Sequence, residues 1–334
     1  MKPKPEPGIC SYGTLIILKH TREIAREIEG VSKANDIEAI HRMRVASRRL
    51  RSALPLFSNC LPARRKSTWE KQIKNITASL GAARDTDVQI ERLSLIFKKL
   101  EDKRLRPGIN RLLVRLKQRR TKMQSEVQAA LNSLVKSNTL GNMDIQLSKK
   151  NDQTEPAFAF SRALYELANG AITQRLNELL SYDEIVYQPE KVAELHQMRI
   201  AAKWLRYTLE IFARIYSDRL RSAVQAGRKI QESLGTIHDD DVWLQYLPEL
   251  GEQERKKTLN YYGNIRPINR LIPGFEYFQE ICQEERNRTY RGFVRDWQRW
   301  KDRGLWDKLR HTIALPLAIS ENIYPPAPPI EELS

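Results

Sequence analysis

Cysteine and long apolar runs are scarce in this 334-residue sequence. Its three cysteines, Cys10, Cys60 and Cys282, are far apart and odd in number. This pattern fits neither a disulfide framework nor a metal knuckle, so we expect free thiols and a reducing, cytoplasmic compartment. The longest apolar run near the start, Leu15 to Leu18, is too short for a secretory signal, and no stretch approaches the ~20 apolar residues of a membrane span. We therefore expect no membrane partner.

Motifs of the common enzyme classes are also missing. The sequence has no Gly-x-x-x-x-Gly-Lys phosphate loop, no nucleophile elbow and no His-Glu-x-x-His zinc motif. Nor do we expect a Glu-x-Glu-x-Lys strand of the triphosphate-tunnel kind. Strand signals and Asn-Gly or Asp-Gly hairpin turns are scarce as well, which favours an all-α fold. We predict a protein that is not an enzyme and that uses no cofactor or metal.

The chain is strongly basic, and the charge is uneven. It has 57 Lys and Arg against 41 Asp and Glu, a formal net charge of +16. Residues 1–150 hold 32 basic and 14 acidic residues, whereas residues 151–334 hold 25 and 27. The first part therefore dominates the long-range attraction of anions, and basic residues of the second part form local clusters in acidic surroundings.

One basic motif occurs twice, as HRMRVASRRLR from His41 and as HQMRIAAKWLR from His196. In each copy a histidine is followed by basic residues 3, 7 and 10 positions later. On an α-helix these four positions fall within an arc of roughly 80°, and apolar residues occupy the opposite arc. We call them the first stripe (His41, Arg44, Arg48, Arg51) and the second stripe (His196, Arg199, Lys203, Arg206).

Charged stripes on helices are usually solvated faces, but two observations argue against that interpretation here. Basic residues are retained at the stripe positions of both copies, whereas Arg42 aligns with Gln197 and Arg49 with Trp204. Neither stripe contains an acidic residue, so like charges crowd together in a way that a bound anion would relieve. Arginine matches phosphate oxygens with a planar fork, and neighbouring cations keep a histidine neutral. The stripes therefore predict a site for a polyanion.

A second pair of segments extends the repeat. Leu80 to Val88 (LGAARDTDV) matches Leu234 to Val242 (LGTIHDDDV), at an offset of 154 residues against 155 for the stripes. So steady an offset indicates an internal duplication of about 150 residues. Each copy is predicted to form four main helices. We expect these helices at 14–29, 36–58, 66–100 with a break near Gly81, 105–136, 157–181, 189–214, 216–250 and 274–301.

The predicted organisation has five parts, and two helix starts have their own signals. Asp36 is suited to cap the second helix, and Pro189 to the first turn of its counterpart. The parts are an N-terminal arm (1–13), a first half (14–136), a polar linker (137–156), a second half (157–310) and a Pro-rich tail (311–334).

Other candidate residues carry weaker signals. Basic residues on the third and fourth helices of each copy could face either the ligand or solvent, and their sequence does not decide between the two. They are Lys71, Lys74, Arg115, Arg119, Lys122, Arg221, Arg228, Arg288 and Arg291. The repeated acids, Asp85 and Asp87 against Asp239 and Asp241, are expected to cap helices or hold arginines. A metal site at His238 to Asp241 is the alternative. It is disfavoured because the first copy has Arg84 in the place of His238.

These paired motifs resemble the CHAD family, named for a conserved histidine in an α-helical domain. The resemblance rests on His41 to Arg51, His196 to Arg206 and the two Leu-Gly segments, and spans roughly residues 14 to 300. It implies two four-helix bundles related by pseudo-twofold symmetry around a central basic pore. It also implies binding of long-chain inorganic polyphosphate, and a location at polyphosphate granules.

On that resemblance the two stripes would line the pore. Sulfate or phosphate could occupy the pore in a crystal. The protein is expected to be a monomer or a dimer. We expect both copies to grip one chain, since two weak sites gain affinity by multivalency. Two alternatives stay open. A nucleic-acid-binding protein fits the charge but lacks the recognised motifs, and a metal-dependent polyphosphate-processing enzyme would need the aspartate segments.

Overall fold

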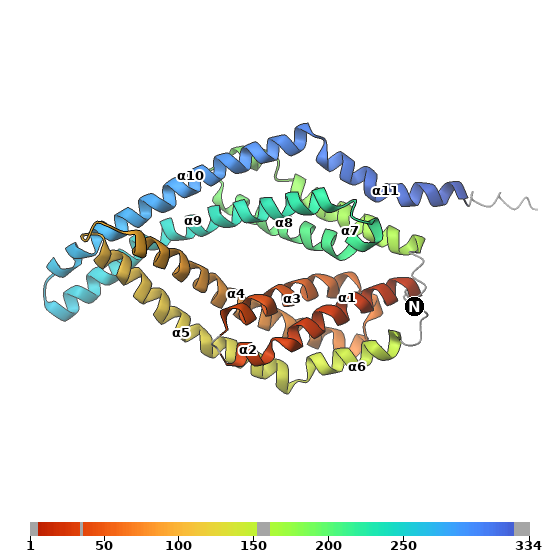
Figure 1. Cartoon of the computed structure of the whole chain (residues 1–334), viewed down its shortest axis with the longest axis horizontal. Coiled ribbons are helices and arrows are strands. Elements are labelled where there is room, and N and C mark those ends of the chain that lie inside the picture. The colour runs from red at the N-terminus through yellow and green to blue at the C-terminus, as the bar shows by residue number, and fades with distance from the viewer. Residues whose placement is uncertain (1–5, 34–35, 152–160, 324–334) are drawn as a thin grey trace, which may run out of the picture.

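The computed structural model describes residues 6–33, 36–151 and 161–323, and all regular secondary structure in these ranges is helical. The all-α prediction is thereby confirmed. Figure 1 shows α1–α6 and α7–α11 as two halves that lie alongside each other. The first half comprises α1 (Pro7–Arg26), α2 (Ile28–Ser32), α3 (Ile37–Leu56), η1 (Ser58–Cys60), α4 (Ala63–Lys99), α5 (Arg106–Lys136) and α6 (Thr139–Asn151). The second comprises α7 (Arg162–Leu180), η2 (Glu184–Tyr187), α8 (Val192–Phe212), η3 (Ala213–Tyr216), α9 (Arg221–Tyr262), η4 (Arg266–Arg270), α10 (Ile272–Asp302) and α11 (Leu305–Ile323).

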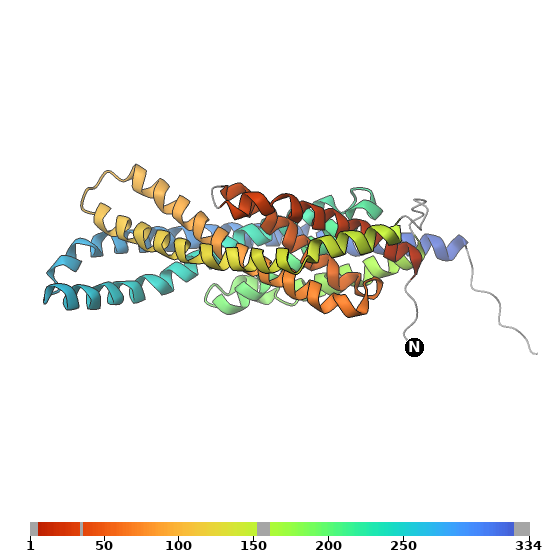
Figure 2. The same ribbon diagram turned by 90° about the horizontal axis from the view of Figure 1, so that it is seen from below.

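Two separate hydrophobic cores divide the molecule into a body and an arm. The body core is built around α3 and α8, and it buries the predicted apolar arcs, including Leu50 and Leu205. The arm core lies between the far ends of α4, α5, α9 and α10, around Leu112, Trp243 and Phe278. Figure 2 shows the hairpins α4–α5 and α9–α10 extending beyond the body. The long helices α4 and α9 contribute to both cores, so they connect the two regions.

The halves touch through close contacts in both regions. In the body, the rings of Tyr12, Phe57 and Phe212 cluster with centroids 6.1–6.2 Å apart. In the arm, α5 and α10 cross at Gly108 and Gly274. A Cβ on Gly108 would lie 2.7 Å from the Cα of Gly274, and a Cβ on Gly274 would lie 2.7 Å from the Cα of Gly108. This backbone-to-backbone approach requires glycine on both helices.

Several predicted boundaries are wrong because helices extend into segments expected to be irregular. The N-terminal arm is helical from Pro7, where Glu6 caps α1. The expected linker holds α6, whose buried Leu140, Met143 and Leu147 follow helical spacing. The start of the expected tail belongs to α11, which ends at Ile323. The rest of the tail, 324–334, lies outside the described residues, as do 1–5 and 152–160.

Two details of the helices also differ from the predictions, and a third is confirmed. Helix α4 runs unbroken through Gly81. Pro189 precedes α8, which begins at Val192 after an N-cap at Lys191. Asp36 caps α3 as predicted, accepting a hydrogen bond from the backbone N–H of Ala39 at 3.0 Å.

The expectation of free thiols is wrong for two of the three cysteines. Cys10 on α1 and Cys60 in η1 form a disulfide, with Cα atoms 5.2 Å apart. Packing of α1 against α3 and η1 brings them together, and their 50-residue separation gave no sign of it. Cys282 is free and buried. The pairing removes the support that the cysteines gave to a reducing compartment. Within the described residues, no helix has the length and apolar character to cross a membrane.

Candidate functional site

The two stripes meet at one cavity, which we call the central cavity. It has a volume of about 370 Å³ and lies between α3, α4 and α8. Five of the eight stripe residues line it, three from the first stripe and two from the second. The lining comprises Arg44, Arg48, Arg51, Ser52, Thr77, Ala78, Gly81, Ala82, Asp85, Arg199, Lys203, Trp204 and Tyr207. Residues 155 positions apart in the chain, such as Arg48 and Lys203, therefore line the same cavity.

Positive charge in the central cavity is largely unbalanced. Among the described residues, Arg48, Arg51, Arg199 and Lys203 have no carboxylate partner. Asp85 is the carboxylate in the lining, and its Oδ1 accepts a hydrogen bond from Arg44 at 2.7 Å. Burial, and after it the charges of Arg48 and Arg199, lower the pKa of Lys203 from 10.5 to about 8. The lining of the central cavity therefore carries a net positive charge.

The fourth residue of the second stripe is turned to a structural contact instead. Arg206 donates from Nε to Glu210 at 2.8 Å, on the same helix. Glu210 also lies 3.3 Å from Nε of Arg49, so it joins α3 to α8. Arg206 does not line the central cavity.

The two stripe histidines do not line the central cavity, but their surroundings match each other. In both halves the imidazole Nδ1 and the Nε of the following stripe arginine are buried and have no hydrogen-bond partner within the part of the chain that the structure describes; the four residues are His41, Arg44, His196 and Arg199. The pKa of each histidine is lowered, chiefly by burial and then by a nearby arginine. The prediction that they stay neutral is supported in direction, although burial outweighs the neighbouring charge that we had invoked. Unpaired buried donors of this kind call for a partner.

The aspartate segments lie inside α4 and α9, so the prediction of helix caps is wrong, whereas that of arginine partners is confirmed for Asp85, Asp87 and Asp241. Asp87 accepts from Arg120 at 2.7 Å, and its counterpart Asp241 pairs with Arg286. Another aspartate of the second segment links the two halves: Asp240 on α9 accepts a hydrogen bond from Arg92 on α4 at 2.7 Å. These contacts fasten α4 to α5, α9 to α10 and α4 to α9.

His238 packs beside a histidine of the second stripe. Its ring lies 4.1 Å from that of His196, and burial lowers its pKa to about 4. No three His, Cys, Asp or Glu side chains in the described ranges are grouped as a metal site. The spacing Glu-x-Glu-x-Lys does occur, from Glu252 to Lys256, but it lies within helix α9 and not in a strand.

The weaker candidates lie in two other cavities and on exposed faces of α4 and α10. Arg221 and Arg228 line a second cavity of about 460 Å³ between the halves, together with Lys19 and Arg49. Tyr207 lines both that cavity and the central one. A third cavity, of about 260 Å³ in the arm, is lined by Arg115, Arg119 and Lys122 beside Trp243.

The remaining candidates are exposed side chains. Lys71 and Lys74 on α4 lie on the turns before Ala78, so they continue the face that lines the central cavity. Arg288 and Arg291 are exposed on α10, where Arg288 lies 3.6 Å from Glu285. Five of the eight stripe residues thus lie at one cavity, whereas the other basic candidates lie elsewhere on the molecule.

Sequence reasoning missed one aromatic contributor. The ring of Trp204 lies beneath Lys203 and Arg51, at 5.3 and 5.9 Å from its centroid. It holds these cations in place by cation–π attraction. The available signal was the aromatic residue that stands directly after Lys203, at the position that Arg49 occupies in the first copy.

Comparisons with known proteins agree on the fold. A family model described as CHAD domain matches residues 15–248. A crystal structure of the CHAD domain from the plant Ricinus communis is similar, with a TM-score of 0.56 and 22% identity over 91% of each chain. PptA from Streptomyces chartreusis has a TM-score of 0.55 and 17% identity, covering 87% of this chain and 99% of that one. No curated protein matches.

Proposed function

The chain belongs to the CHAD family, which is linked to polyphosphate binding in general, and from this premise we propose that it binds long-chain inorganic polyphosphate without chemically changing it. The binding site would be the central cavity, and the two halves would grip one polyphosphate chain together. In this proposal the halves act as related bundles around a basic pore that the two stripes line.

One observation carries the proposal: five cations from two halves surround one cavity that has a single carboxylate in its lining. Such crowding is unfavourable unless an anion enters, because like charges repel strongly where water is partly excluded. Phosphate oxygens would accept hydrogen bonds from the buried Nε atoms of Arg44 and Arg199, which have no partner among the described residues.

The continuity of the basic surface favours a chain over a single phosphate. Tyr207 lines both the central cavity and the second cavity, which carries Arg221 and Arg228. Lys71 and Lys74 extend the same face of α4 toward its N-terminal end, away from Asp85. A polymer with about one charge per phosphate and no bases would meet cations along this path.

Nucleic acid fits this arrangement less well. The central cavity lies between helices and encloses about 370 Å³, which suits a thin phosphate chain. A duplex would have to bind exposed cations elsewhere on the surface, and its bases would find few aromatic platforms beside the stripes.

The decisive experiment is calorimetric titration with long-chain polyphosphate at near-physiological salt, with orthophosphate and duplex DNA as comparison ligands. We expect tight binding to polyphosphate alone, and an affinity that falls steeply with salt as counterions are released. The variant Arg48→Ala/Lys203→Ala should weaken binding at least about a hundredfold, since two contacts to phosphate are lost.

The matched control is Lys98→Ala/Lys99→Ala, which removes the same charge from the exposed end of α4. It should change the affinity by less than about threefold. Equal or tighter binding of DNA would overturn the proposal. The shared grip fails if Arg44→Ala/Arg48→Ala and Arg199→Ala/Lys203→Ala each leave binding unchanged.

A further inference from the structure

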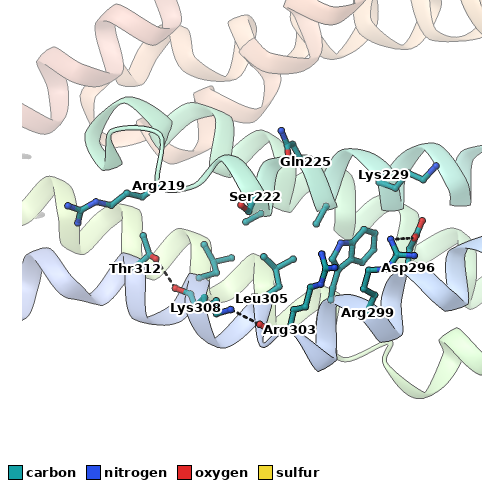
Figure 3. A pocket seen from close by; sticks show the side chains of 14 residues that line it. Arg219, Ser222, Gln225, Lys229, Asp296, Arg299, Arg303, Leu305, Lys308 and Thr312 are labelled. Carbon is teal, nitrogen blue, oxygen red and sulfur yellow. Dashed lines mark hydrogen bonds and ion pairs between the residues drawn. The ribbon is translucent and has the colours of Figure 1, made fainter.

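A larger cavity lies on the outer side of the second half, between α9, α10 and α11. It has a volume of about 720 Å³ and shares no lining residue with the central cavity. Figure 3 shows side chains of α9 on one side and of α10 and α11 on the other. On α9, Ser222 and Lys229 lie roughly 140–160° around the helix from Gly227, which packs against Arg206 of α8. The polar side chains of α9 at this outer cavity therefore lie on a different face of the helix from Gly227, and Ala223 and Ala226 line the cavity between them.

Cations surround the outer cavity from both sides. Arg219 and Lys229 come from the α9 side, and Arg303 from the junction of α10 and α11. These three side chains have no carboxylate partner among the described residues. Arg299 is paired with Asp296 at 3.2 Å, and Lys308 donates to the Arg303 carbonyl oxygen at 2.8 Å. Three cations are thus free to meet an anion.

The outer cavity also has an apolar wall, which the central cavity lacks on this scale. Trp300 is half-buried and lies against Trp306, with ring centroids 6.5 Å apart. Leu305 and Leu309 continue this wall along α11. A flat ring could rest against these side chains while charged groups reach the arginines.

A tight turn holds the two parts of this wall together. Gly304 joins α10 to α11 with a φ of +61°, a conformation that favours glycine. The turn places Trp300 near the end of α10 and Lys308 at the start of α11 beside the same space. These helix segments lie beyond residues 15–248, which the family model matches, so the outer cavity is partly made by chain outside that match.

We propose that the outer cavity binds a nucleoside triphosphate. Its phosphates would contact Arg219, Arg303 and Lys229, and its base would stack on Trp300. The volume falls within the range of roughly 300–1,000 Å³ typical of small-molecule sites, and the mixture of an apolar wall with a few charged groups is typical too. Inorganic triphosphate would satisfy the cations but leave the indole unused. This proposal does not depend on polyphosphate binding in the central cavity.

The test is calorimetric titration with ATP, in EDTA so that protein cations and not a metal ion neutralise the phosphates. We expect one ATP per chain. The variant Arg219→Ala/Arg303→Ala should lower the affinity at least about tenfold, because two charge-assisted contacts are lost. The central-cavity variant Arg48→Ala/Lys203→Ala should leave it within about twofold.

Tripolyphosphate separates base recognition from phosphate recognition. The substitution Trp300→Leu keeps an apolar side chain against Trp306, and its melting curve would verify folding. It should weaken ATP at least about fivefold while changing tripolyphosphate less than about twofold. The proposal is overturned if Arg219→Ala/Arg303→Ala leaves ATP binding intact, or if Arg48→Ala/Lys203→Ala abolishes it. It is also overturned if tripolyphosphate binds as tightly as ATP and Trp300→Leu affects neither.

Discussion

Arginines of the arm and arginines of the central cavity have opposite surroundings. Near the arm, Arg115 meets the buried Glu254, and Arg286 meets Asp241. Around the central cavity, Arg48, Arg51 and Arg199 have no carboxylate partner among the described residues. Paired arginines hold helices together, whereas the charge of the unpaired ones is not balanced by a carboxylate among the described residues. A basic helix face therefore identifies a binding site only when its internal partners are known.

The body and the arm are also fastened differently. The body has a covalent tie between Cys10 and Cys60, and a large apolar core. The arm has a smaller core, and ion pairs such as Arg92 with Asp240 fasten it where it leaves the body. Reduction should therefore weaken the body, whereas removal of a buried charge should weaken the arm.

The largest expected effect comes from opening the disulfide. Closing a 50-residue loop stabilises the folded state by about 4 kcal/mol on the chain-entropy model. We expect dithiothreitol, or Cys10→Ser, to lower the free energy of unfolding by an amount of this order in urea titrations. Cys282→Ser, which breaks no bond, serves as the control for loss of a thiol. An unchanged midpoint under reduction would contradict the covalent tie.

Removing a paired arginine near the arm should come next. Arg286→Met leaves the half-buried Asp241 without its cation, and we expect a loss of about 3 kcal/mol in unfolding free energy. Polyphosphate affinity should stay within about twofold, because Arg286 lies outside the central cavity. Arg288→Met, on the exposed face of the same helix, should change stability by less than about 0.5 kcal/mol. A fall in affinity with Arg286→Met would erase the distinction between the two groups of arginines.

Removing an unpaired cation should have the reverse outcome. Lys203→Met relieves repulsion from Arg48 and Arg199, so we expect the ligand-free protein to gain about 1 kcal/mol of stability. The same substitution should weaken polyphosphate binding about tenfold, because one phosphate contact is lost. Thermal melting and calorimetry on one sample would measure both. Loss of stability together with loss of affinity would show Lys203 to be a structural residue.

The smallest effect concerns pH. Lys203, with a pKa of about 8, loses its proton above pH 8 in the free protein, and a bound phosphate would favour the charged form. Affinity is therefore greatest below pH 8, and we expect it to fall several-fold between pH 7 and 9.5. Titrations of Lys203→Arg, which stays charged, should show a flatter profile. A flat profile for the unmodified protein would mean that Lys203 makes no contact with the ligand.

The apolar arcs and the two basic stripes could be predicted because the duplication shows which positions the two copies share. Met43, Leu50 and Phe57 in one copy match Met198, Leu205 and Phe212 in the other, and all are buried. Arg48 and Lys203 share one cavity because equivalent helices, α3 and α8, pack against each other. The repeat made these residues equivalent, and packing made them neighbours.

Partners distant in the sequence could not be predicted. Arg115 is 139 residues from Glu254, and no local pattern links them. Helix α6 was not predicted because most of its residues are polar. Its apolar residues Leu140, Met143 and Leu147 nevertheless have helical spacing and are buried. The pairing of Cys10 with Cys60 depends on how α1 packs, which spacing alone does not reveal.

The crossing of α5 and α10 at Gly108 and Gly274 restricts which substitutions this protein can accept during evolution. Neither residue has a side chain. Any other residue at either position would place a Cβ against the backbone of the opposite helix, so one helix would have to move. Each position tolerates change only if the other half of the molecule yields. Relatives with the same crossing should therefore keep both glycines, and those that have lost one should have the two helices further apart.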